Sequence, residues 1–183
     1  MKLYEINKEY LEYLHKIDSR VLAHNVDKHQ RKFIAIKIKL NGYQYFVPLS
    51  SPDLRDYYRD EQGIKRVQFT RVPTIKRIFN GNPTVESYLG KLLFNNMIPA
   101  LQGDYDEFNI FLEKDKKYKG LLIDQIQVLR SRKNQEDILK RAQIVYKLKN
   151  RNSTYPFIQQ ATVDFCLLET ALDKWKKNKD VNE

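Results

Sequence analysis

The dipeptide Asn41-Gly42 constrains the fold more than any other feature of this chain, because it joins two segments in which apolar and polar residues alternate. Before the turn, one face of an extended segment carries the apolar residues Ile34, Ile36, Ile38 and Leu40. Asn-Gly between two such segments is a strong signal for a two-residue hairpin. We therefore predict an antiparallel hairpin of residues 33–40 and 43–48. Pro48 lacks an N–H, so it should end the second strand or lie at an edge.

Shorter elements are expected on both sides of this hairpin. A strand at residues 3–6 should precede a helix that begins after the N-cap Asn7 and has an apolar face formed by Tyr10, Leu11, Leu14 and Ile17. Further strands are predicted at residues 66–72, 74–80 and 85–100.

The apolar pattern changes to helical spacing in the last third of the chain. Asn134 is expected to cap one of the helices, and the last helix is defined by Phe165, Leu168, Leu172 and Trp175. The single cysteine, Cys166, lies in that apolar stretch and is expected to be buried. The sequence thus predicts one α+β domain over residues 1–183, rich in strands to about residue 112 and helical from about 116 to 177.

The chain is strongly basic, with 33 Lys and Arg residues against 23 Asp and Glu and a formal net charge of +10. A surplus of this size usually indicates a polyanionic partner, most often nucleic acid, although a basic protein without such a partner is the alternative. We find neither a secretion signal nor a run of about 18 apolar residues that could span a membrane. We therefore expect a cytoplasmic protein.

Several kinds of catalytic centre are absent from the sequence. It has no Gly-rich phosphate-binding loop, no Gly-x-Ser-x-Gly motif, and no His-x-x-x-His or Cys-x-x-Cys motif. A metal site from His15, His24 and His29 would need a carboxylate such as Asp27, and nothing in the spacing requires one. We expect no metal and no cofactor.

One reaction class fits a basic domain of this kind. RNA carries its own nucleophile, the 2′-OH, so its cleavage needs positioning, proton transfer and stabilisation of charge on the phosphate. Hydroxyl groups, backbone N–H groups and Lys or Arg side chains can stabilise that charge. Tyrosines in polar, basic contexts favour unpaired bases over duplex DNA, because such bases stack on aromatic rings; these tyrosines are Tyr57, Tyr58, Tyr105 and Tyr118.

The predicted hairpin brings a basic loop to a pair of serines. If the hairpin closes at Asn41-Gly42, residues 31–33 lie opposite residues 49–51, so Arg31 and Lys32 should meet Ser50 and Ser51 at the open end. Ser-Ser-Pro is also ordinary turn sequence, so a purely structural role is the alternative.

A wider basic surface could follow an RNA backbone. The candidates for RNA binding are Lys32, Tyr58, Lys65, Arg66, Arg71, Lys76, Arg77, Lys91, Lys116, Lys117 and Tyr118. For each lysine or arginine the alternative is a solvated strand edge, where positive charge prevents aggregation.

The sequence resembles the ToxN/AbiQ endoribonucleases, the toxins of type III toxin–antitoxin systems. "FIAIKIKLNGYQYFVPLSSP" resembles their central hairpin, and "FNNMIPA" resembles their second signature. "YKGLLIDQIQVLRSRKNQEDILKRAQIVYKL" resembles their long helical segment. The likeness extends from about Leu3 to Trp175, and the CptN branch is the most similar in character.

The resemblance implies a compact, partly open antiparallel β-barrel core of the MazF/Kid type with packed helices. It implies metal-independent cleavage of cellular and phage RNA to 2′,3′-cyclic phosphate and 5′-OH ends. It also implies an antitoxin that is an RNA pseudoknot, processed by the toxin and inhibiting it in a closed protein–RNA assembly, as part of phage defence. A non-catalytic RNA-binding module is the alternative.

The family's functional residues fall on specific positions of this chain. Its Ser-Pro serine falls on Ser51, the residue before it on Ser50, and a basic residue ahead of the hairpin on Arg31 or Lys32. The family often follows Ser-Pro with Lys-x-Lys, whereas this chain has Asp53 at the first lysine and Arg55 at the second. We expect Arg31 and Arg55 to bind the scissile phosphate, Ser51 to act with Ser50, and His29 to serve as general base or acid.

Overall fold

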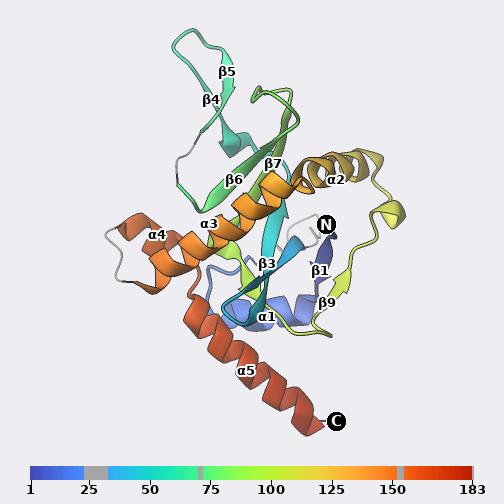
Figure 1. Cartoon of the computed structure of the whole chain (residues 1–183), viewed down its shortest axis with the longest axis vertical. Coiled ribbons are helices and arrows are strands. Elements are labelled where there is room, and N and C mark those ends of the chain that lie inside the picture. The colour runs from blue at the N-terminus through green and yellow to red at the C-terminus, as the bar shows by residue number, and fades with distance from the viewer. Residues whose placement is uncertain (23–32, 70–71, 152–154, 183) are drawn as a thin grey trace.

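The computed structural model describes residues 1–22, 33–69, 72–151 and 155–182 (Figure 1). Its main sheet is antiparallel, with strand order β6-β7-β3-β2-β1-β9 and with β8 also paired to β3. The strands are β1 (Tyr4–Ile6), β2 (Ile34–Leu40), β3 (Tyr43–Ser50), β6 (Ile75–Phe79), β7 (Tyr88–Leu93), β8 (Ile98–Pro99) and β9 (Tyr105–Glu107). Within the described residues the end strands β6 and β9 do not pair with each other, so the sheet does not close into a barrel.

The predicted hairpin is confirmed, in a register from Leu40↔Tyr43 to Ala35↔Pro48. Asn41 and Gly42 have φ values of 51° and 86°, the positive values that a tight type I′ turn requires. The prediction for Pro48 was wrong, because β3 continues to Ser50. On its other side β3 pairs with β8 at residues 45–46 and with β7 at residues 49–50. Pro48 lies where β3 changes neighbours, a position that tolerates a missing N–H.

A separate two-stranded sheet projects from the main body (Figure 1). It consists of β4 (Tyr57–Arg59) and β5 (Lys65–Val67) and follows directly on the short 3₁₀ helix η1 (Leu54–Asp56). The strand predicted at residues 66–72 is therefore shorter and starts one residue earlier. The segment predicted as one strand at residues 85–100 divides into β7, the 3₁₀ helix η2 (Phe94–Asn96) and β8.

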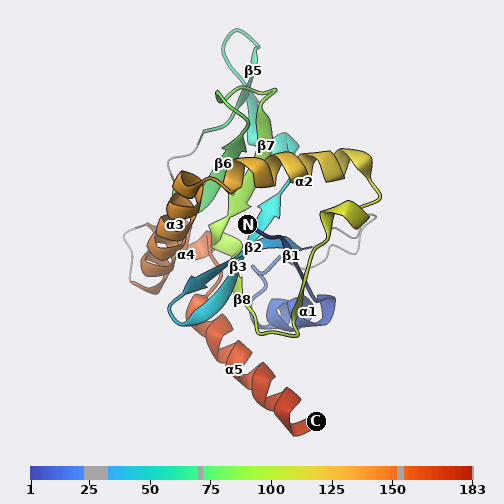
Figure 2. The same cartoon turned by 45° about the vertical axis from the view of Figure 1, so that its right-hand side comes forward.

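Helices surround the sheet on several sides, with α2 and α3 crossing it and α1 lying beside its lower end (Figures 1 and 2). They are α1 (Lys8–Ile17), α2 (Lys116–Leu129), α3 (Arg132–Asn150), α4 (Pro156–Ala161) and α5 (Phe165–Asn182). Before α2 runs the 3₁₀ helix η3 (Ile110–Leu112). The cap of α3 is Ser131, whose Oγ accepts from the Asn134 N–H; Asn134 instead donates through Nδ2 to Val128 O, so the predicted cap was wrong.

The core lies between the sheet and the helices. Its largest fully buried side chains include Tyr10, Tyr45, Phe46, Phe94 and Phe165. Cys166, predicted to be buried, is exposed. The inward face of α5 carries residues 165, 168, 169 and 172, whose helical spacing turns the position after Phe165 to the outside.

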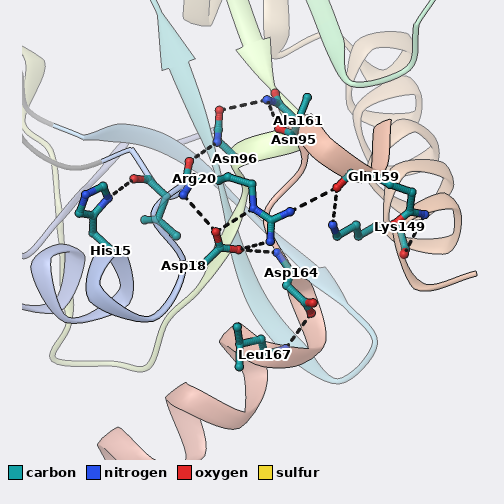
Figure 3. Close-up of polar contacts among 11 residues, drawn as sticks. His15, Asp18, Arg20, Asn95, Asn96, Lys149, Gln159, Ala161, Asp164 and Leu167 are labelled. Atoms are coloured by element: carbon teal, nitrogen blue, oxygen red, sulfur yellow. Dashed lines mark hydrogen bonds and ion pairs between the residues drawn. The ribbon is translucent and has the colours of Figure 1, made fainter. Parts of the chain in front are cut away.

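A buried carboxylate fixes the chain after α1 (Figure 3). Asp18 is 5 % exposed and accepts hydrogen bonds from Arg20 Nε and Nη2, each at 2.8 Å, and from the Asp164 N–H at 2.7 Å. Asn96 Nδ2 donates to Arg20 O at 2.8 Å. Asn96 of η2 therefore holds the backbone that follows α1 at Arg20.

No helix among the described residues combines the length and the apolar character needed to cross a lipid bilayer.

Candidate functional site

Ser50 forms one row across the sheet with two basic residues. It is the residue of β3 directly opposite Lys91 of β7, and Lys91 is directly opposite Arg77 of β6. Residues directly opposite each other in antiparallel strands place their side chains on the same face. The sheet therefore presents a hydroxyl and two cations side by side at the end of β3.

Asp56 joins this row to the turn that follows Ser51. Its side chain is 4 % exposed, and its Oδ1 accepts hydrogen bonds from Lys91 Nζ and, at 3.2 Å, from Arg77 Nη1. Its Oδ2 accepts from the Asp53 N–H at 2.9 Å. Arg77 Nη1 also donates to the Tyr88 hydroxyl at 3.1 Å. We call Asp56, Arg77, Tyr88 and Lys91 the Asp56 cluster.

The Asp56 cluster carries more positive than negative charge, since two cations face one carboxylate. Burial acts to raise the pKa of Asp56, but the Lys91 ammonium and the Asp53 N–H outweigh it and hold that pKa below its usual value. Burial raises the pKa of Tyr88, so its hydroxyl stays protonated and neutral. The cluster therefore keeps about one uncompensated positive charge in a partly buried place, where charge interactions are stronger than in water.

The turn between β3 and η1 is built around Asp53. The Asp53 carboxylate accepts from the Arg55 N–H at 3.0 Å and from Arg55 Nε at 2.8 Å. The Arg55 guanidinium, backed by that N–H, lowers the pKa of Asp53 to about 2. The Arg55 side chain is 89 % exposed, so this cation is at the surface but already paired.

Ser50 and Ser51 differ in their hydrogen bonds. Ser50 Oγ donates to Ser51 O at 3.1 Å, and both residues are half-buried. The hydroxyl of Ser51 has no hydrogen-bond partner among the described residues, so it can contact a ligand without breaking an internal bond there.

The close approach of β7 to β3 positions the backbone of Ser50. Gly90 of β7 has a φ of 121°, and β7 is irregular here, where the register shifts between Ile78 and Phe79 of β6. The buried side chain of Gln125, on α2, donates to Leu89 O at 2.6 Å and to Ser50 O at 3.4 Å. An irregular strand beside a site of this kind is a common way to aim a side chain.

Four of the predicted site residues, namely His29, Arg31, Lys32 and Arg71, lie outside the described residues. The hairpin register points toward the predicted meeting, because continuing Ala35↔Pro48 by two residues brings Phe33 opposite Ser50. The approach of Arg31 and Lys32 to the serines stays a prediction. His15 lies elsewhere, with its Nδ1 2.7 Å from Val21 O.

The predicted RNA-binding residues fall into separate regions. Arg77 and Lys91 belong to the Asp56 cluster, and Lys76 Nζ pairs with Asp137 Oδ2 at 2.6 Å. The projecting β4–β5 sheet carries Tyr58, which is half exposed, Lys65, whose Nζ is 3.9 Å from the centre of the Tyr57 ring, and Arg66, which pairs with Asp60. Lys116, Lys117 and Tyr118 form the first turn of α2, at its end away from α3 (Figure 1).

Sequence reasoning missed Asp56, Tyr88, Gly90 and Gln125. A glycine inside a predicted strand signals a bulge or a close approach, so Gly90 could have been found. Asp53 and Asp56 form a reciprocal capping box around η1, and their spacing was visible in the sequence. Nothing local marks Tyr88 or Gln125, because their contacts depend on how distant segments pack.

The fold and the site define an α+β protein with a positively charged serine turn at the end of a central strand. The sequence profile of the family "Toxin ToxN, type III toxin-antitoxin system" matches residues 2–173. The chain belongs to this family.

Curated relatives and solved structures are similar over nearly the whole chain. Endoribonuclease ToxN of Bacillus thuringiensis subsp. kurstaki is 28 % identical, covering 100 % of this chain and 88 % of the relative. Endoribonuclease ToxN of Pectobacterium atrosepticum is 27 % identical (100 % and 99 %), and Endoribonuclease AbiQ of Lactococcus lactis subsp. lactis is 28 % identical (97 % and 90 %).

A solved structure, from work on selective toxin inhibition by a non-coding RNA pseudoknot in type III systems, has a TM-score of 0.73 and 26 % identity, covering 96 % of this chain and 97 % of that chain. A second structure, of the lactococcal anti-phage endoribonuclease AbiQ, has a TM-score of 0.75 at 22 % identity, covering 96 % and 98 %, and shares the fold.

Proposed function

We propose that this protein is an endoribonuclease toxin that cleaves RNA without metal and is inhibited by an RNA pseudoknot. The observation that carries the proposal is the row of Ser50, Lys91 and Arg77 at the end of β3. The next residue in the chain is Ser51, whose hydroxyl has no partner within the described part of the chain. Relatives across the whole chain are named endoribonucleases, and one similar structure comes from work on toxin inhibition by an RNA pseudoknot. The net charge of +10 suits an RNA partner.

The proposed reaction is an internal transesterification. The 2′-oxygen of the RNA attacks the adjacent phosphorus while the bond from phosphorus to the 5′-oxygen breaks. A base removes the 2′-OH proton and an acid protonates the leaving 5′-oxygen, which gives 2′,3′-cyclic phosphate and 5′-OH ends. The protein has to align these atoms and stabilise charge on the phosphate.

The residues divide these tasks. Ser51, supported by Ser50, hydrogen-bonds a phosphate oxygen, and Arg31 and Arg55 neutralise its charge. His29 serves as general base or acid. Lys91 and Arg77 have side chains that are 13 % and 9 % exposed, so they act through the excess charge of the Asp56 cluster rather than by lying on the substrate.

The wider setting follows from the same proposal. Lys32, Lys65, Arg66, Arg71, Lys76, Lys116 and Lys117, with Tyr58 and Tyr118, contact the antitoxin RNA and the cellular or phage transcripts. The protein acts in the cytoplasm as a single domain and forms a closed protein–RNA assembly with its antitoxin. Its open sheet corresponds to a partly open barrel of the MazF/Kid type.

The test is cleavage of RNA in EDTA by the wild type and by Ser51→Ala, with the product ends mapped. We expect cleavage by the wild type, cyclic-phosphate ends, and a loss of at least about 100-fold in rate for Ser51→Ala, as for removal of a group that stabilises transition-state charge. Ser19→Ala is the matched control, because Ser19 is an exposed serine in the turn after α1, and this variant should cleave normally.

Two other outcomes would decide against the proposal. Equal cleavage by the wild type and Ser51→Ala would remove Ser51 from the mechanism. Tight, salt-sensitive RNA binding without cleavage by either protein would instead favour the non-catalytic RNA-binding module.

A further inference from the structure

Two aromatic rings, Phe69 and Phe79, stack on each other at the outer edge of the sheet. Phe79 ends β6, and Phe69 lies two residues after β5. Their ring centres are 5.9 Å apart and their planes differ by 17°. Phe69 is nevertheless 65 % exposed, so much of its surface is open to a further planar group.

These rings line a shallow cavity together with three cations. The cavity has a volume of about 190 Å³ and is lined by Phe69, Ile75, Lys76, Arg77, Phe79 and Arg141. We call it the Phe69 cavity. Two carboxylates pair with these cations. Asp137 pairs with Lys76 and Arg141, and Asp56 pairs with Arg77. Three cations against two carboxylates leave the cavity positive.

Arg141 keeps donors for a ligand. Arg141 uses Nε for Asp137, at 3.1 Å to Oδ1 and 2.9 Å to Oδ2, and its Nη groups have no partner among the described residues. The Arg77 Nε–H also has no acceptor in the described part of the chain, but it is buried, so Arg77 contributes positive charge to the cavity rather than a donor. A guanidinium with free donors, as at Arg141, binds phosphate oxygens well, because it presents several donors in one plane.

We propose that the Phe69 cavity binds one unpaired nucleotide of an RNA strand, with the base stacked on Phe69 and the phosphate at Arg141. Flat aromatic faces favour a base, and the positive charge favours the phosphate that accompanies it. A base inside a duplex could not reach Phe69, so the nucleotide has to be unpaired.

The position of the cavity relates it to the proposed cleavage. Arg77 belongs both to the Phe69 cavity and to the Asp56 cluster, and it lies two strands from Ser50. At a strand spacing of about 4.7–4.9 Å, Arg77 and Ser50 are about 10 Å apart along the row. The proposal rests on the proposed endoribonuclease function and adds that a nucleotide near the cut is held by stacking.

Tryptophan fluorescence can test the stacking directly. Phe69→Trp places an indole in the cavity, and Phe111→Trp, at a residue of η3 that is 82 % exposed, is the matched control. The probe is a single-stranded 2′-O-methyl RNA, which has no free 2′-OH and cannot be cleaved by the proposed route. We expect saturable quenching in Phe69→Trp and none in Phe111→Trp. An abasic residue placed at successive positions of the probe should abolish the quenching at one position.

Affinity measurements provide a second test. Stacking of one base contributes about 1–3 kcal/mol, so Phe69→Ala should weaken binding of the same RNA by about 5- to 150-fold. Phe111→Ala should stay within about twofold. Arg141→Gln should reduce the slope of log K against log salt by about 0.7, as for one lost phosphate contact on a single strand.

The failures are distinguishable. If the wild type cleaves and binds RNA while Phe69→Trp is not quenched and Phe69→Ala binds normally, the cavity proposal is overturned and the proposed function stands. If the wild type neither cleaves nor binds RNA, the cavity proposal and the proposed endoribonuclease function are both overturned. Quenching of Phe69→Trp by adenosine monophosphate but not by the RNA would assign the cavity to a free nucleotide and overturn the RNA proposal.

Discussion

Gly90 and Ser50 approach so closely that no side chain fits between them. A Cβ added to Gly90 would collide with the Ser50 carbonyl oxygen and would lie 2.9 Å from Gln125 Nε2. The φ of 121° at Gly90 is also unfavourable for any residue with a side chain. The place of Ser50 beside Lys91 thus depends on the absence of a side chain at the neighbouring position of β7.

Gly90→Ala should therefore destabilise the protein by roughly 2–4 kcal/mol, through overpacking and backbone strain. Urea unfolding measures this free energy. Gly120→Ala is the matched control, because a Cβ at Gly120 of α2 meets nothing within 4 Å and alanine favours a helix. Gly120→Ala should leave the stability equal or slightly higher, and equal unfolding free energies for Gly90→Ala and the wild type would contradict the close approach.

Asp56→Asn should lower the free energy of unfolding more than the loss of an exposed carboxylate does. It leaves the buried cations of Lys91 and Arg77 without a counter-charge, and breaking a buried ion pair typically costs about 3–5 kcal/mol. Asp60→Asn is the control, since Asp60 pairs at the surface with the half-exposed Arg66, and such solvated pairs contribute little to stability. Similar losses in both variants, measured by urea unfolding, would show that the Asp56 cluster is not a buried electrostatic centre.

Acid should destabilise the protein through Asp18. Burial acts to raise the pKa of Asp18, but the Arg20 guanidinium and the Asp164 and Arg20 N–H groups lower it overall. The unfolded chain therefore binds a proton at a higher pH than the folded chain does. The stability from Asp18 is present above the unfolded pKa of about 3.9 and is lost as the pH falls through the lower, folded pKa.

The measurement is the free energy of unfolding by urea between about pH 6 and pH 3. The wild type should lose stability as the pH falls from about 5, and Asp18→Asn, which has no carboxylate there, should lose it less steeply. An unchanged slope in Asp18→Asn would rule out a contribution from this group.

The sequence determined the hairpin well because its signals are local. Asn41-Gly42 specifies a turn geometry, and the alternating residues on each side specify a register once the turn is set. A local signal failed at Pro48. Whether a backbone N–H is needed there depends on the strands beside β3, and these come from elsewhere in the chain: β8 pairs with residues 45–46 and β7 with residues 49–50.

The candidate site was only partly visible in the sequence. Ser50 and Ser51 stood out through the proline turn, and Lys91 and Arg77 stood out as basic residues of predicted strands. That these four lie at one end of the sheet depends on β3 pairing with β7 across about 40 residues of chain, which no local pattern encodes. Asp56 escaped notice for the same reason, since its partners come from β6 and β7.

The departure of this chain from the family's Lys-x-Lys pattern yields a last prediction. Asp53 stands where the family often has a lysine, and it pairs with the 89 % exposed Arg55. Asp53→Asn keeps an Oδ1 that accepts the Arg55 N–H, and asparagine is as good an N-cap as aspartate, so η1 should survive. The variant removes the negative charge and releases the Arg55 guanidinium for a phosphate.

Asp53→Asn should thus bind single-stranded RNA more tightly, with a slope of log K against log salt that is steeper by about 0.7. The double variant Asp53→Asn/Arg55→Gln should lose this gain, because the released cation is then absent. Binding of a 2′-O-methyl RNA at several salt concentrations measures both. A gain that persists in the double variant would show that the carboxylate acts by repelling RNA directly, and no gain in Asp53→Asn would show that Arg55 does not face the RNA.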